Sequence, residues 1–283
     1  MFGKRNDGKL VTDLDAIAKM MPLLMPTRTG AQNYFLLEQD LTEIDKYIET
    51  KEKEGETYTY MHILSAILVR VFKMYPRLNR FITNKRIYQR NKIEVSVLVK
   101  KSLREVDGEE LVKPEFTGYE TLAEVKEKID SLVKEIINMK DRKDNNVTGL
   151  DKLPFFLLKL AIWFMKWSDK HGFMPKSLMQ SSPFHCSIFF TNLKSLHVDR
   201  IYHHLYDFGN CGFFVAMGKE KTIPMVNSDG KVVPTKVLPM GISMDERYID
   251  GYYYSKVLKT IKRMLANPEI LDKPLSDDEI FKK

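Results

Sequence analysis

The sequence has little cysteine and lacks the common motifs of nucleotide, zinc and serine chemistry. Cys186 and Cys211 are its only cysteines, and neither belongs to a C-x-x-C or Cys/His cluster, so we expect no bound metal and a reducing, cytoplasmic setting. No G-x-x-x-x-G-K-[ST] loop, G-x-S-x-G elbow or H-E-x-x-H pair occurs. A P-loop nucleotide site, an α/β-hydrolase and a zinc protease are therefore excluded.

A membrane-spanning run is also missing. The most apolar segment, residues 154–167, is about 14 residues long and contains Lys159 and Lys166, whereas a bilayer needs roughly 20 residues. Segments of this kind are mostly buried core or subunit contact, and contact with a membrane surface is the weaker alternative. The charged residues 1–7 precede no apolar stretch, so we expect no secretory signal and a mature protein that is the whole chain.

The 283 residues are 43% hydrophobic and show no repeat or heptad pattern, which predicts one globular domain. The net charge of +7 suits an anionic ligand or surface. It is spread through the chain without a zinc-finger or helix-turn-helix signature, so we expect no nucleic acid partner.

Four helices follow from apolar spacing and capping signals. Helices are expected at Met61–Tyr75, from the capping box Thr121–Glu124 onward, at Asp151–Lys170 and at Tyr252–Ala266. Strand-like runs lie between them at Tyr34–Gln39, Ile93–Val99, Cys186–Thr191, Phe213–Met217 and Leu238–Met244, with a hairpin from Ile223–Val226 through Ser228-Asp229-Gly230 to Lys231–Val237. This order predicts an α/β (α+β) two-layer sandwich, with a mixed sheet covered by helices.

Histidine is the only remaining candidate for a general base among residues that titrate near neutral pH. Most single histidines are surface or core residues, and the adjacent pair His203 and His204 is the more interesting case. The six histidines are His62, His171, His185, His197, His203 and His204.

The segment Met240–Gly251 resembles the active-site strand and turn of the acyltransferase cores of 2-oxo acid dehydrogenase complexes, which share the chloramphenicol acetyltransferase fold. That family's signature is D-H-R-x-x-D-G. Asp245, Arg247, Asp250 and Gly251 match it, whereas Glu246 stands where the catalytic histidine belongs.

Other stretches resemble the same family in the same order. They are Arg28–Ile44 (first strand and helix start), Met61–Ile82 (a helix ending in a P-x-L-N turn), Ser187–Leu193 (the F-T-x-S-N-L-G strand) and Leu265–Glu269. The resemblance covers roughly residues 15–272, with 1–14 as an N-terminal extension and 273–283 as a tail. It implies a free-standing member without a lipoyl domain, assembled as a homotrimer with active sites at the subunit interfaces.

The resemblance also implies a CoA-dependent acyltransferase. An acyl group other than amino-acyl would pass between a CoA thioester, the cosubstrate, and a small thiol, hydroxyl or amine acceptor, entering from opposite sides of a channel. Thr191 would donate to the oxyanion, Asp250 would hold the turn, and Arg247 and Gly251 would shape it. Glu246, or His203 or His204 nearby, would act as base, facing Thr191 across a tunnel shared by two copies.

A carboxylate is a weak replacement for imidazole. Proton transfer from a thiol to a glutamate of ordinary pKa costs about 3 kcal/mol more than transfer to a histidine, or roughly a hundredfold in rate. The alternatives are therefore a degenerate trimer that binds CoA, an acyl ligand or a protein, and a peripheral membrane protein that uses residues 155–167. CoA contacts are not assignable. The loops Val106–Gly118 and Asp141–Asp151 are surface connections or shape access to the site.

Overall fold

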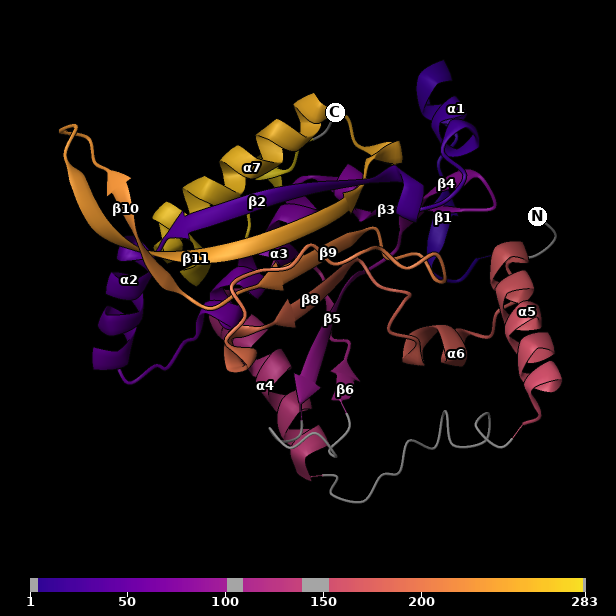
Figure 1. Cartoon of the computed structure of the whole chain (residues 1–283), viewed down its shortest axis with the longest axis horizontal. Helices are drawn as coiled ribbons and strands as arrows, with labels where there is room; N and C mark the ends of the chain where they lie inside the picture. Colours follow the sequence, from indigo (N-terminus) through magenta and orange to yellow (C-terminus); the bar gives the residue numbers. More distant parts are fainter. Residues whose placement is uncertain (1–4, 101–108, 139–152, 282–283) are drawn as a thin grey trace.

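The computed structural model describes residues 5–100, 109–138 and 153–281 (Figure 1). Its main sheet has the strand order β10-β11-β9-β8-β5-β6, with β2 paired to β11 and β7 paired to β5. Strand β8 runs parallel to β5 and β9, and the other pairings are antiparallel. The strands are β2 (Gln32–Asp40), β5 (Ile93–Lys100), β6 (Glu109–Val112), β7 (Glu115–Phe116), β8 (Ile188–Asn192), β9 (Phe213–Met217), β10 (Lys221–Val226) and β11 (Val232–Asp245).

Three long helices cover one face of this sheet. Helices α3 (Tyr60–Met74), α4 (Leu122–Asn138) and α7 (Gly251–Ala266) bury their apolar sides in a single core with the strand residues that point toward them (Figure 1). In α3, Pro76 follows the end as the sequence predicted. Thr59 caps the N-terminus, which the sequence analysis did not anticipate. The mixed sheet with helices on one face confirms the expected two-layer architecture.

A smaller sheet and the chain ends complete this body. Strand β1 (Gly8–Leu10) pairs with β4 (Arg86–Arg90), which forms a hairpin with β3 (Arg80–Thr83). Leu275 lies in the main core, and Val11, Leu14 and Phe281 pack against it. The remaining helices are α1 (Ala16–Leu24), α2 (Thr42–Lys53), α5 (Phe155–His171) and α6 (Lys176–Ser181).

Helix α5 corrects the expectation for the apolar segment 154–167. It begins at Phe155 because Pro154 has an extended backbone, φ −52° and ψ 143°. Its expected start, Asp151, and the whole Asp141–Asp151 loop lie outside the described residues. Of the other expected loop, Val106–Gly118, the described residues 109–118 contain the short strands β6 and β7. The segment was expected to be buried core or subunit contact, and within one chain it is not buried core: Trp163 is 60% exposed and Phe155 74%. Subunit contact stays a prediction. None of the described helices is long and apolar enough to cross a bilayer.

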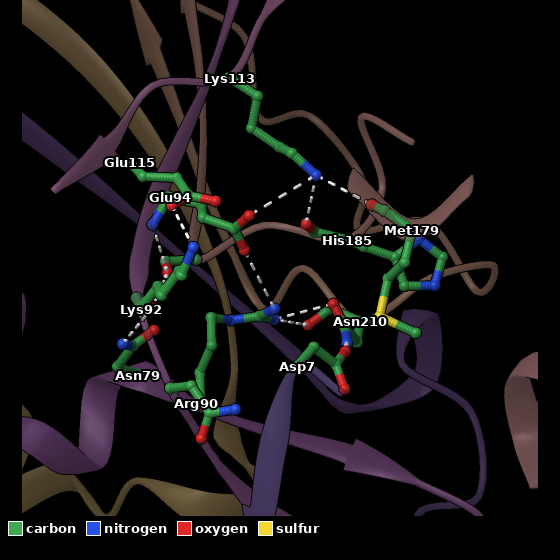
Figure 2. A network of polar contacts seen from close by, with 12 residues as sticks. Asp7, Asn79, Arg90, Lys92, Glu94, Lys113, Glu115, Met179, His185 and Asn210 are labelled. Carbon is green, nitrogen blue, oxygen red and sulfur yellow. Dashed lines mark hydrogen bonds and ion pairs between the residues drawn. The ribbon is translucent and has the colours of Figure 1, made fainter. Parts of the chain in front are cut away.

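A buried polar network holds the segments that precede β8 and β9 (Figure 2). The Lys113 ammonium donates to the carbonyls of Met179, Ser182 and His185 at 3.0–3.1 Å. Arg90 donates to the Asn210 side chain at 2.8 Å. Because buried donors and charges are costly unless partnered, these bonds hold the backbone before β8 and before β9 in fixed positions.

Candidate active site

The second face of the main sheet is covered by the segment between β8 and β9 instead of by helices. Its central residues pass so close to the sheet that side chains are excluded beneath them. A Cβ on Gly218 would lie 1.3 Å from the Asp199 carbonyl oxygen, and one on Gly241 would lie 2.0 Å from that of Ile201. Glycine at these two positions, one just after β9 and one within β11, therefore lets residues 199–201 cross the sheet and places His203 at its surface.

A cavity of about 730 Å³ opens where this segment meets β8, and both Thr191 and His203 line it. Most of its walls are apolar, among them Phe189, Leu193 and Phe214. A largely apolar cavity with a few polar groups is the usual form of a small-molecule site.

The imidazole of His203 is oriented by two contacts. Its ring stacks on that of Phe214, with centroids 4.1 Å apart and 2° between the planes. Its Nδ1 lies 2.8 Å from the backbone oxygen of His204. Since a carbonyl oxygen only accepts, Nδ1 carries the proton of the neutral ring and Nε2 keeps the lone pair.

Burial sets the charge state of this ring. Desolvation lowers the pKa of His203 below its ordinary value of 6.5, and outweighs the opposing effect of the bond to the His204 carbonyl. The imidazole is therefore neutral at neutral pH and able to accept a proton at Nε2.

Thr191 reaches the same face through the register of the sheet. It pairs with Ala216 on β9, and Ala216 pairs with Gly241 on β11, so these residues form one row directly under the crossing segment. The Thr191 side chain is largely buried, and within the described part of the chain its hydroxyl has no hydrogen-bond partner. It is therefore free to donate to a ligand in the cavity.

Glu246 is not brought to Thr191 within one chain. Thr191 is level with Gly241, whereas Glu246 follows the end of β11 five residues later. At about 3.3 Å per strand residue, this separates them by roughly 16 Å along the sheet, in addition to the width of two strand steps. The Glu246 carboxylate instead accepts a 2.5 Å hydrogen bond from the Asn33 amide.

Arg247 and Asp245 form a buried pair that holds the turn after β11. The Arg247 guanidinium donates to both carboxylate oxygens of Asp245 at 2.8 and 2.6 Å, and Arg28 lies 3.8 Å away on the other side of Asp245. Burial alone would lower the pKa of Arg247, but Asp245 outweighs it and raises the pKa. Two matching residues of the D-x-R-x-x-D-G motif thus act on each other.

Asp250 and Gly251 begin α7. The Asp250 carboxylate caps the helix by accepting the Tyr253 N–H at 2.8 Å, and it lies 3.3 Å from Arg77. Gly251 was expected to permit a tight backbone, but its φ is not positive and a Cβ would meet no atom within 4 Å. The structure gives no reason for glycine at this position.

The other histidines have structural surroundings. His204 is exposed and does not line the cavity, while His62 binds Asp130 and His185 lies 3.3 Å from Asp169. Across the described ranges, no cluster of three His, Cys, Asp or Glu side chains is arranged to hold a metal ion.

Sequence reasoning missed the residues that build the cavity. The sequence pattern identified Phe214 and Phe189 only as strand residues. In the structure their rings stack on each other with centroids 4.8 Å apart, and the ring of His203 stacks on that of Phe214. Gly241 carried a usable signal, because an isolated glycine within a strand often marks a close approach of another backbone.

A family profile matches part of this site. The catalytic domain of the 2-oxoacid dehydrogenases acyltransferases matches residues 212–271, from β9 through α7. The matched stretch contains the turn at Glu246–Gly251 and ends short of Thr191 and His203 on the N-terminal side. A search of curated protein sequences gave no significant match.

Solved structures resemble the chain over nearly its whole length. A probable dihydrolipoamide acetyltransferase from Listeria monocytogenes 4b F2365 has a TM-score of 0.58 at 13% identity, over 96% of this chain and 99% of that one. The dihydrolipoamide acetyltransferase of Azotobacter vinelandii has 0.59 at 14%, over 96% and 94%. A chloramphenicol acetyltransferase has 0.53 at 11%, over 91% and 99%. At these identities the likeness establishes the fold, which is chloramphenicol acetyltransferase-like as expected.

Proposed function

We propose that this chain is an acyltransferase that moves an acyl group between a CoA thioester and a small thiol, hydroxyl or amine acceptor. The observation that carries the proposal is that Thr191 and His203 line one cavity, the first with a free hydroxyl and the second with Nε2 available as a base. The profile match over residues 212–271 and the acetyltransferase folds found among similar structures support the reaction class.

His203 takes the role that the resemblance first assigned to Glu246. Its Nε2 removes the proton from the acceptor, whose sulfur, oxygen or nitrogen then attacks the thioester carbonyl. The carbonyl oxygen becomes negative and accepts a hydrogen bond from the Thr191 hydroxyl, a contact worth about 3 kcal/mol in such sites. When the tetrahedral intermediate collapses, the CoA thiolate leaves and takes the proton back from the imidazolium.

The cavity suits this substrate class. Its apolar walls accommodate an acyl chain and the alkyl part of a pantetheine arm, and they exclude water from the thioester. CoA itself is the cosubstrate.

We also propose that the chain works as an oligomer, a homotrimer in the form that the resemblance implies. One similar structure is the cubic core of a pyruvate dehydrogenase multienzyme complex, at a TM-score of 0.60 and 12% identity. Because one chain keeps Glu246 and Thr191 at different ends of the sheet, any meeting between them requires a second copy.

The test is thiol release from a panel of acyl-CoA esters of increasing chain length, with dihydrolipoamide, an alcohol or an amine as acceptor. Release that depends on the acceptor supports a transferase. Binding of acyl-CoA without release under any condition would instead indicate the degenerate alternative, in which the protein holds the ligand and does no chemistry.

A further inference from the structure

Helix α5 has the arrangement opposite to that of a packed helix, because its buried residues are polar and its large apolar side chains are exposed. Only Ser168 and Asp169 are buried. Asp169 ties the last turn to the body through Arg5 at 3.0 Å. The exposed apolar side chains are Phe155, Phe156, Leu157, Leu160, Ile162, Trp163, Phe164 and Trp167.

The spacing of 3.6 residues per turn divides the outer surface of α5 into two stripes. Phe156, Trp163 and Trp167 fall on one stripe together with Leu160 and Phe164. Lys159, Lys166 and Lys170 fall on the adjacent stripe. The less exposed residues Leu158, Ala161, Met165 and Ser168 form the third side, which faces the protein.

The basic stripe borders a pocket of about 360 Å³, here called the basic pocket, whose cationic walls are Arg28, Lys85, Lys166, Lys170 and Arg247. Two acids also line it. Asp169 is paired with Arg5 and His185, and Asp207 accepts the backbone N–H groups of Arg28 and Thr29.

The excess positive charge of the basic pocket comes from its lysines. Arg28 and Arg247 are neutralised in part by Asp245. No carboxylate lies within 4 Å of Lys85, Lys166 or Lys170 in the portion of the chain that the structure describes. A ligand that enters here is therefore anionic.

Helix α1 borders the same pocket from the other side through Pro22 and the residues that follow it. It too carries an exposed apolar stripe, with Ile17, Met20 and Leu24 at i, i+3 and i+7. Figure 1 places α1 and α5 on the same side of the molecule, away from the β10-β11 hairpin.

We propose that α1, α5 and the basic pocket form a docking surface for an anionic phospholipid bilayer. Tryptophan and phenylalanine side chains enter the boundary between headgroups and acyl chains, while lysines beside them bind lipid phosphates. A contact of α5 with the α5 of a second copy is disfavoured, because it would bring the unpaired lysines of both copies together. A head-to-tail contact, as in a trimer, is the outcome that the assembly measurement below distinguishes.

Intrinsic fluorescence offers a direct test, since Trp163 and Trp167, both on α5, are the only tryptophans of the chain. Vesicles of phosphatidylcholine with about 30% phosphatidylglycerol should shift their emission to the blue, and brominated acyl chains should quench it. Phosphatidylcholine alone should bind more weakly, and raising NaCl should release the protein.

Two double variants with the same change in net charge distinguish binding through this surface from an effect of the overall charge of the protein. We expect Lys166→Glu with Lys170→Glu to lower the fraction that sediments with these vesicles by about tenfold or more. Lys259→Glu with Lys262→Glu, exposed on α7, makes the same change in net charge and should leave binding intact. Phe156→Gln with Trp163→Gln should also lower binding, with circular dichroism as the check on folding.

Equal binding by the two charge variants, or no binding of the parent protein to any vesicle, would overturn the proposal. Two results together would show instead that a second copy covers α5. The first is a blue shift that depends on protein concentration in the absence of lipid, and the second is a change of assembly mass in the variant with Phe156→Gln and Trp163→Gln. Acyl transfer is measured separately, so failure here leaves the proposed reaction standing.

Discussion

The ring of His203 lies flat on the ring of Phe214, with 4.1 Å between centroids, while its Nδ1 is held by the His204 carbonyl. These two contacts leave the ring one free nitrogen, in a cavity that Thr191 also lines. A residue from a loop and a residue from a strand are thus held at one site by the sheet beneath them.

His203→Gln should lower kcat by about 10²-fold or more, because it removes the group that accepts the proton. Glu246→Gln is the matched control, and we expect it to retain kcat within about threefold. Both are measured by thiol release from the preferred acyl-CoA. If the Glu246 variant loses activity and the His203 variant keeps it, the assignment of the base is reversed.

Thr191→Val should lower kcat by about 10²-fold with little change in KM, since the hydroxyl acts on charge that develops only in the transition state. Thr191→Ser keeps a hydroxyl and should restore most of the rate. Equal rates for the valine and serine variants would remove Thr191 from the mechanism.

The rate should fall on the acid side with a midpoint below pH 6.5. Protonation of Nε2 removes the base, and because burial lowers the pKa of His203, a lower pH is needed to protonate it. A profile of kcat/KM against pH measures this midpoint. A midpoint at or above pH 7 would contradict the half-buried imidazole of His203 as the base.

Gly241→Ala should destabilise the protein by about 2 kcal/mol or more and reduce activity, because the added Cβ would lie 2.0 Å from the Ile201 carbonyl oxygen and push away the segment that carries His203. Gly251→Ala meets no atom within 4 Å and should change stability by less than about 1 kcal/mol. Urea unfolding compares the two. Similar losses in both would argue against the close crossing at Gly241.

Asp250→Ala should cost about 1 kcal/mol through loss of the α7 cap, while kcat stays within about threefold. The expected fall in Tm is about 2 °C for a domain of this size. Asp250→Asn keeps the capping oxygen and serves as the control. A large loss of kcat in both variants would give Asp250 a role in the reaction beyond capping.

Local patterns determined the elements of this fold. The apolar spacing after Met61 places both ends of α3 to within a residue, the capping box at Thr121 places the start of α4, and the run Phe213–Met217 coincides with β9. These features depend on neighbouring residues in the chain, so the sequence alone carries them. The hairpin β3–β4 and the short strand β1 were missed, because they are stabilised mainly by distant partners.

The sequence also supplied Thr191, Glu246, His203 and His204 as candidates, but it did not show which of them meet. That depended on strand register and on the crossing of residues 199–201 over Gly218 and Gly241. Together they place His203 at the cavity that Thr191 lines and leave Glu246 beyond the end of β11. The exposure of α5 was likewise invisible in its composition, because an apolar helix has the same letters whether it faces a core or solvent. The sequence determines which candidate side chains are present, whereas the distances between them are set only by the long-range packing of strands and loops.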